Sequence, residues 1–126
     1  MHCRVAIALG ATVILSVAPA AILMAQSSPP TFQADPSVYK VIFENENFRV
    51  IAATWKAGQT DQPHSHPVPS VLYSLNDCTL RITNPDGTTR DLVGKAGAAA
   101  AIPITASHSA RNVGSTDCQA VFVERK

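Results

Sequence analysis

Short β-prone segments separated by turn residues follow one another from residue 38 onward, and this pattern constrains the fold most. One turn, Asn84-Pro85-Asp86-Gly87, is a strong hairpin signal because proline presets φ and glycine tolerates positive φ. Regularly spaced short strands of this kind are typical of an all-β sandwich or barrel. Strands are expected at residues 38–43, 48–55, 70–75, 79–83, 88–93, 98–102, 108–113 and 119–123.

One segment also has a helical interpretation. Residues 96–101 are almost all alanine, the residue with the highest helix propensity. The run is short, contains Gly97 and stops at Pro103, so a strand is expected there instead. No stretch of ten or more residues after the N-terminal segment has a clean helical period, and no internal repeat or second domain is evident.

The N-terminal segment, residues 1–25, has a different character. It carries Arg4 near its start, then an uncharged apolar run, and it ends in small residues at Ala25. These features are typical of a secretory signal peptide, with cleavage after Ala25 or at Ala18-Pro19-Ala20. An uncleaved membrane anchor is the alternative, because about 20 apolar residues can span a bilayer. Pro19 interrupts the run and favours cleavage.

The rest of the chain is expected to form one domain. Residues 26–37 are polar and proline-rich, which predicts a flexible lead-in to a domain at 38–126. A domain of about 100 residues can fold without a metal or a disulfide. The whole chain has a formal charge of +1, and removal of Arg4 makes acids and bases equal in number. This balance excludes the basic footprint of nucleic-acid binding, and of membrane binding after signal cleavage.

Two cysteines, Cys78 and Cys118, remain after the segment that contains Cys3 is removed. An even number of cysteines in an oxidising compartment is compatible with a disulfide. Two buried thiols are the alternative, because a sequence gives no Cα distance. We predict a Cys78–Cys118 disulfide in a protein exported to the periplasm or the extracellular space.

Three histidines stand where they can bind a metal. His64 and His66 are two residues apart, so in a strand both side chains point to the same face. His108 lies far along the chain, and a barrel can bring it into the same interior. Exposed loop histidines and a structural His108 are the alternatives. Asp61 is either an acceptor that orients an imidazole or a solvated loop acid, and the second role is expected.

The spacing of the first two histidines resembles the first sequence motif of the cupin superfamily. Gly58, His64 and His66 match the first half of that motif. In the same register, Ser70 stands at the position of the motif's glutamate and Asp77 at that of its second glycine. The chain therefore departs from the pattern at the residue that usually supplies a carboxylate ligand.

A second cupin motif is matched by Gly97, Pro103, His108 and Asn112, with Thr105 in place of its second glycine. The two motifs occur in the family's order, and the resemblance covers about residues 38–123. The chain is identified on these motifs as a member of the small single-domain cupins. The resemblance implies a double-stranded β-helix, which is a jelly-roll barrel with a metal inside its mouth.

The resemblance also implies a cofactor. Cupins commonly bind Fe, Mn, Ni, Zn or Cu through three histidines and one glutamate. Here the expected ligands are His64, His66 and His108, and the neutral hydroxyl of Ser70 is a poor fourth ligand. Some relatives, such as thiol dioxygenases, use three histidines alone. A neutral three-histidine site with open positions suits Fe(II), which is therefore the favoured metal.

Two classes of function follow. The first is an Fe(II)-dependent, dioxygenase-like enzyme acting on a small molecule. The second is a non-catalytic, degenerate cupin that binds a small ligand or a metal, and enzyme status stays open between them. The expected pocket residues are Ser70 and Tyr73, and a homodimer is a further option. Ala99–Ala101 and Ala110 stand where cupins often carry Val or Phe, and their small side chains either enlarge the cavity or are balanced elsewhere.

Overall fold

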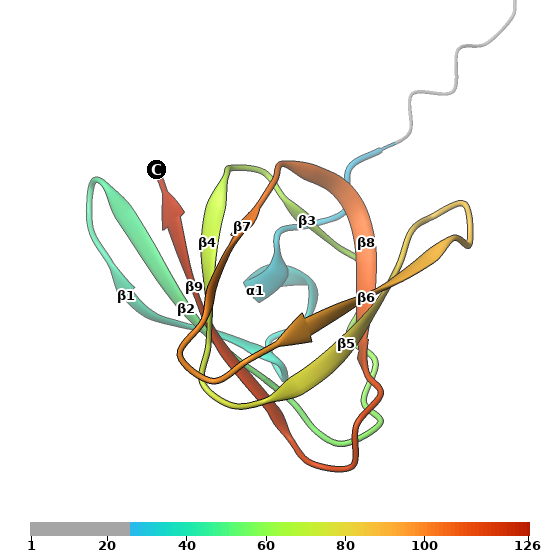
Figure 1. Cartoon of the computed structure of the whole chain (residues 1–126). Coiled ribbons are helices and arrows are strands. Elements are labelled where there is room, and N and C mark those ends of the chain that lie inside the picture. Colours follow the sequence, from blue (N-terminus) through green and yellow to red (C-terminus); the bar gives the residue numbers. More distant parts are fainter. Residues whose placement is uncertain (1–25) are drawn as a thin grey trace, which may run out of the picture.

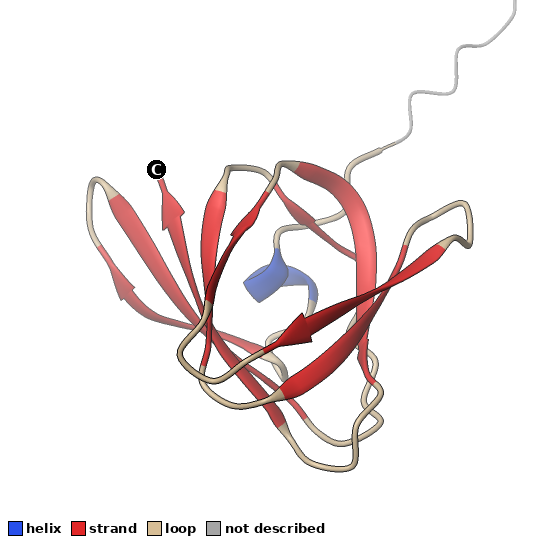
Figure 2. Cartoon of the chain, viewed as in Figure 1, coloured by secondary structure: helices blue, strands red, loops and turns tan. Residues whose placement is uncertain are grey.

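The computed structural model describes residues 26–126, which form a barrel of antiparallel strands with one short helix (Figure 1). Figure 2 shows that strands dominate the regular structure, so the expected all-β class is confirmed. The predicted signal peptide, residues 1–25, lies outside the described residues. The elements are α1 (Thr31–Ala34), β1 (Tyr39–Glu44), β2 (Phe48–Trp55), β3 (His64–His66), β4 (Ser70–Ser74), β5 (Cys78–Thr83), β6 (Thr89–Gly94), β7 (Ala99–Ile102), β8 (Thr105–Asn112) and β9 (Cys118–Arg125).

Two sheets build the barrel, with strand orders β1-β2-β9-β4-β7 and β3-β8-β5-β6. Strands that are distant in sequence pair side by side, as β2 does with β9 and β3 with β8. The second pairing sets His64 directly opposite His108. The topology therefore joins the two sequence motifs that carry the histidines.

Alternating side chains fill the barrel. In β9 every second residue from Cys118 onward is buried, and in β4 the inward residues are Ser70, Leu72 and Ser74. Because successive side chains of a strand point to opposite faces, each strand gives one set to the interior and one to the outer surface. The buried apolar core consists of Val38, Tyr39, Ile51, Ala53, Trp55, Leu72, Leu80, Ile82, Ala110, Cys118, Ala120 and Phe122.

Each strand expected from the sequence is present, with ends displaced by a few residues. The alanine run forms β7, so the strand interpretation of this segment is confirmed over the helical one. Its pairing with β4 supplies the backbone hydrogen bonds that outweigh the helix propensity of alanine. Gly58 and Gly97 both have positive φ, 75° and 79°, as expected for motif glycines placed in turns.

The structure of the lead-in, residues 26–37, differs from the flexible segment that the sequence predicted. Residues 26–37 were expected to be flexible, yet Thr31–Ala34 form one helical turn and the side chain of Thr31 is buried. Pro30 forms a parallel bridge with Ser65, and α1 packs against β1 and β3. The polar, proline-rich composition indicated flexibility, but contacts with the barrel order this segment. Within residues 26–126 no helix has the length and apolarity that a membrane crossing needs.

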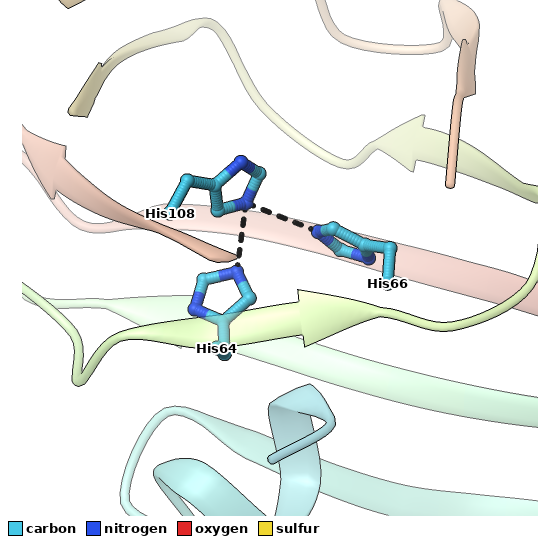
Figure 3. Close-up of side chains that lie close together, drawn as sticks. All are labelled: His64, His66 and His108. Atoms are coloured by element: carbon cyan, nitrogen blue, oxygen red, sulfur yellow. Dashed lines mark hydrogen bonds between the residues drawn. The ribbon is translucent and has the colours of Figure 1, made fainter. Parts of the chain in front are cut away.

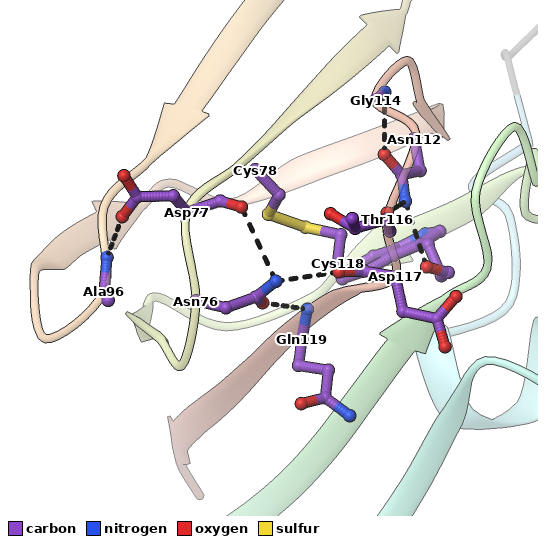
Figure 4. The surroundings of a disulfide bond; sticks show 11 residues. Asn76, Asp77, Cys78, Ala96, Asn112, Gly114, Thr116, Asp117, Cys118 and Gln119 are labelled. Atoms are coloured by element: carbon purple, nitrogen blue, oxygen red, sulfur yellow. Dashed lines mark hydrogen bonds between the residues drawn. A yellow bond between two sulfur atoms is a disulfide. The ribbon is translucent and has the colours of Figure 1, made fainter.

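A disulfide joins the two sheets at one end of the barrel (Figure 4). It links Cys78, the first residue of β5, with Cys118, the first residue of β9, whose Cα atoms lie 5.4 Å apart. The side chain of Asn76 donates to the carbonyl of Asp117 at 2.8 Å and accepts from the amide of Gln119 at 2.8 Å. The predicted pairing is confirmed, and side-chain bonds hold the two turns beside it.

Removal of this disulfide should destabilise the barrel. The bond spans 40 residues, and closing a loop of that size stabilises a domain by about 2–4 kcal/mol. The double variant Cys78→Ala/Cys118→Ala should lose about that much unfolding free energy in urea denaturation. Wild-type protein in reductant is the control and should approach the variant. Equal stability of the oxidised wild type and the double variant would contradict the prediction.

Candidate metal centre

Three buried histidine side chains meet inside the barrel (Figure 3). His64 and His66 come from β3, and His108 comes from β8. The Nε2 atom of His108 lies 3.0 Å from Nε2 of His64 and 3.2 Å from Nε2 of His66. The structure thus brings together all three histidines that the sequence singled out, and their nitrogens form a group that can hold a metal ion.

A register shift in β3 shapes this cluster. His64 pairs with His108, whereas His66 pairs with Thr105, so one extra residue lies on the β8 side. Such bulges re-aim side chains near functional sites. Ser65, on the opposite face of β3, is also buried, and its amide donates a hydrogen bond to the carbonyl of Pro29 in the lead-in. The folded lead-in therefore covers the outer face of the strand that carries two of the imidazoles.

The orientation of His64 is fixed by its other ring nitrogen. Nδ1 lies 3.0 Å from the backbone carbonyl of Gln62. A carbonyl only accepts, so Nδ1 carries the proton and the lone pair of Nε2 is free. Nε2 lies 3.0 Å from Nε2 of His108. A ring with its proton on Nδ1 and a free lone pair on Nε2 is the tautomer that a metal ligand requires.

The carboxylate of Asp61 is hydrogen-bonded to residues that surround the histidine cluster. Asp61 is 3% exposed, so the expectation of a solvated loop acid is wrong. Its carboxylate accepts hydrogen bonds from the Tyr39 hydroxyl at 2.7 Å, the Trp55 indole at 2.9 Å and the Ala110 amide at 2.7 Å. Its distance to Nδ1 of His64 is 3.6 Å, too long for a hydrogen bond. Asp61 therefore orients the site by fixing the residues packed around His64.

The nitrogen positions are compatible with a metal ion. Ligands about 2.0–2.1 Å from one ion and at right angles to each other lie about 3 Å apart, which is the separation of Nε2 of His108 from Nε2 of His64 and of His66. Without an ion, one ring nitrogen of His108 faces two other ring nitrogens and can bond to only one of them well. Burial lowers the pKa of His66 to about 4 and that of His108 to about 3, each aided by neighbouring imidazoles. The rings of His66 and His108 are therefore neutral and available as ligands at pH 7.

A cavity of about 30 Å³ adjoins the histidines. Its walls are mostly apolar, and the ring of Phe122 stacks on His66 with a centroid distance of 5.7 Å. Arg90 is the one charged side chain that lines it, and it makes no ion pair with residues 26–126. A volume of this size holds an ion with one or two small ligands.

The two predicted pocket residues have different positions. Tyr73 is 44% exposed on the outer face of β4, so its assignment to the pocket is wrong. The alternation of the strand explains this, because Ser70 and Leu72 take the inward positions. Ser70 is buried and its hydroxyl has no hydrogen-bond partner among the described residues. Ser70 does not line the cavity and is not part of the histidine cluster.

A buried carboxylate that the sequence did not reveal lies beside Ser70. Glu124 of β9 pairs directly with Ser70 of β4 and faces the interior, where it is 2% exposed. Burial raises the pKa of Glu124, while Arg49, 3.3 Å away, acts in the opposite direction. Its place near the chain end is typical of a solvated residue. Only the alternation of β9 could have indicated that it points inward.

The buried Asn112 explains one motif position. Its side-chain amide donates to the carbonyls of Trp55 at 3.1 Å and Thr116 at 2.8 Å, and its oxygen accepts from the amide of Gly114 at 3.0 Å. These bonds tie the end of β8 to β2 and to the turn before β9. The residue stabilises the fold that positions His108, and it does not contact the histidines.

A small antiparallel barrel with three converging imidazoles in its interior defines the class of this protein. No family model matches the chain, and no curated protein sequence matches it. Solved structures do: a cupin-domain protein from Bordetella pertussis Tohama I has a TM-score of 0.66 at 20% identity, covering 80% of this chain and 98% of that one.

Two further structures agree. An RmlC-like cupin from Methanocaldococcus jannaschii, described as a double-stranded β-helix, has a TM-score of 0.57 at 13% identity, covering 90% of this chain and 93% of that one. A double-stranded β-helix protein from Klebsiella pneumoniae has a TM-score of 0.56 at 20% identity, with 90% of each chain covered. The fold is the double-stranded β-helix of single-domain cupins, as the two motifs predicted.

The lowered histidine pKa values predict how the metal-free protein responds to acid. An unfolded histidine has a pKa near 6.5, so the unfolded chain binds protons that folded His66 and His108 do not. The free energy of unfolding therefore has its full value, as far as these two histidines are concerned, above about pH 6.5. It falls as the pH drops toward 4. At pH 5 each of the two histidines should lower the free energy of unfolding by about 2 kcal/mol relative to pH 7.

Urea unfolding of the metal-free protein at pH 7 and pH 5 measures this loss. His66→Gln removes one titrating ring, and the loss should shrink by about half. The comparison cancels the contributions of titrating groups that do not interact with His66. An unchanged loss in His66→Gln would show that His66 is not kept neutral by the fold.

Proposed function

We propose that the protein is an exported metal-dependent cupin that binds one divalent ion, with Fe(II) favoured, through His64, His66 and His108. The observation that carries this is the approach of the three Nε2 atoms, at 3.0 Å and 3.2 Å from the central one. The donor set is neutral and made only of nitrogen, which suits Fe, Ni, Zn or Cu better than Mg or Ca. The disulfide supports export to an oxidising compartment.

We further propose that the site works as a dioxygenase-like enzyme on a small anionic molecule. A bound Fe(II) would supply open positions for O₂ and substrate. The chain supplies the rest: apolar walls exclude water, Asp61 fixes the residues around His64, and Arg90 offers a positive charge at the cavity. A small anion would meet no carboxylate among the residues that line this cavity.

A non-catalytic binding module is the second candidate. The cavity lining contains no carboxylate, and its histidines are the expected metal ligands. Acid–base catalysis therefore has no free histidine or carboxylate at the metal, and Tyr39 is held by Asp61 with its pKa well above the usual value because of burial. This lining favours a site that binds a ligand without turning it over, unless the metal supplies the chemistry.

Metal content tests the ligand set. Wild-type protein should retain about one equivalent of iron after anaerobic loading and desalting, as measured by elemental analysis. His108→Ala should retain less than about a tenth of that, because one of three ligands is lost. Thr105→Val, which alters another cavity residue without removing a ligand, should bind as the wild type does. Full metal content in folded His108→Ala would exclude the three-histidine site.

An open coordination position and the role of Arg90 can be tested together. Protein loaded with Co(II) should change its visible absorption spectrum on titration with azide, a small anion that adds to open positions. Arg90→Gln should weaken azide binding about three- to tenfold, up to about 1.4 kcal/mol, because the cavity loses its positive charge. Arg81→Gln is the matched control, since Arg81 pairs with Asp91 on the surface.

Two outcomes would count against the enzymatic proposal. A spectrum that azide does not change would mean that no position is open, and the binding module would then be favoured. Equal weakening in Arg90→Gln and Arg81→Gln would show a general charge effect and remove Arg90 from the site.

A further inference from the structure

The barrel contains a second cavity, larger than the one at the histidines and at the end that carries the disulfide. Its volume is about 100 Å³. Its walls include Leu72, Leu80, Leu92, Ala100, Ala120 and the Cys78–Cys118 disulfide. None of the three histidines lines it. This cavity is therefore distinct from the proposed metal centre.

Strand register shows that the cavity belongs to the barrel interior. Leu72 pairs with Ala100 and Leu80 pairs with Leu92, so these side chains share the inward face of their sheets. The three leucines also line the cavity beside the histidines. They form a wall with the metal centre on one side and the larger cavity on the other.

The cavity opens between the two sheets. β6 is the edge of one sheet, β7 is the edge of the other, and the two strands do not pair (Figure 1). Ala100 faces inward and is nevertheless exposed, as expected where the barrel wall is open. The seam between β6 and β7 therefore gives a ligand a route from solvent that does not pass the histidines.

Small residues keep this space empty. Residues 98–100 on one side of the seam are all alanine, so no large side chain reaches into the cavity from β7. On the other side, Gly94 carries no side chain, and a Cβ there would lie 2.8 Å from the hydroxyl oxygen of Ser74, which would have to move. The alanine run that suggested an enlarged cavity in the sequence lies at this seam and not at the metal centre.

The chemistry of the walls defines what can bind. Lys95 is the one charged residue of the lining, and its ammonium group is already paired with Asp77 at 3.0 Å. A single water needs about 10–15 Å³, and apolar cavities of about 150 Å³ bind benzene or xenon. Ser74 supplies the one hydroxyl of the lining, and the other walls are mostly leucine, alanine and the disulfide. A space of about 100 Å³ with such walls favours an apolar occupant over water.

We propose that this cavity is a binding site for a compact, uncharged apolar group, such as a short aliphatic chain or a single aromatic ring, which enters between β6 and β7. Binding uses burial of apolar surface and needs no metal. The site is therefore independent of the proposed function, and the metal-free protein binds the same group.

Benzene is a suitable probe, and methyl NMR spectra of the metal-free full domain report its position. Titration should shift the methyl signals of Leu72, Leu80, Leu92, Ala100 and Ala120 in a saturable manner. Ala100→Phe should weaken binding at least tenfold, because its ring occupies the cavity. Ala100→Leu fills less space and should weaken binding to a smaller degree, which keeps the test valid if the phenylalanine variant does not fold.

The matched control is Ala101→Phe. Ala101 is the next residue of β7 and pairs with the outward Val71, so its side chain lies on the outer surface. This variant should bind benzene as the wild type does. All three β7 variants should also load metal normally, which separates this proposal from the one for the histidines. Absence of saturable shifts, shifts centred on Ile82 and Phe122, or equal binding by folded Ala100→Leu and wild type would overturn the proposal.

Discussion

The buried carboxylate of Asp61 is the interaction on which the site depends. It accepts hydrogen bonds from Tyr39 of β1, Trp55 of β2 and the backbone of β8. A buried charge is costly unless such bonds satisfy it, so these three strands must keep their relative positions. His64 packs against Tyr39 with a centroid distance of 5.2 Å, and His108 lies two residues before Ala110. The same carboxylate therefore couples both sheets to the imidazole cluster.

The barrel interior has two cavities, and only one of them is lined by histidines. Three imidazoles and Arg90 gather in one cavity, whereas leucines, alanines and the disulfide surround the other. Leu72, Leu80 and Leu92 stand between them. The disulfide lines the larger cavity and joins β5 to β9, which belong to different sheets. One small fold can in this way offer two chemically different cavities.

Local sequence patterns predicted most of the fold. Turn signals such as Asn84-Pro85-Asp86-Gly87 and alternation such as that of β5 are set by neighbouring residues, so they can be recognised without a structure. The short strand β3 was harder to place, because Pro63 and Pro67 flank it and are typical of loops. The lead-in was interpreted wrongly as flexible for a related reason: its order comes from contacts with β1 and β3 and not from its own composition.

The sequence by itself determined the all-β class, the order of the two motifs that resemble those of cupins, the three histidines and the cysteine pair, because each depends on residue identity and spacing along the chain. Tertiary structure alone decided which side chains share the interior. It placed Glu124 and Asp61 inside, Tyr73 outside and the exposed Arg90 at the border of the histidine cavity, and it located the alanines of β7 at a second cavity. The physical reason is that burial and pairing depend on strand register between segments far apart in sequence, and a shift of one residue reverses which face each side chain occupies.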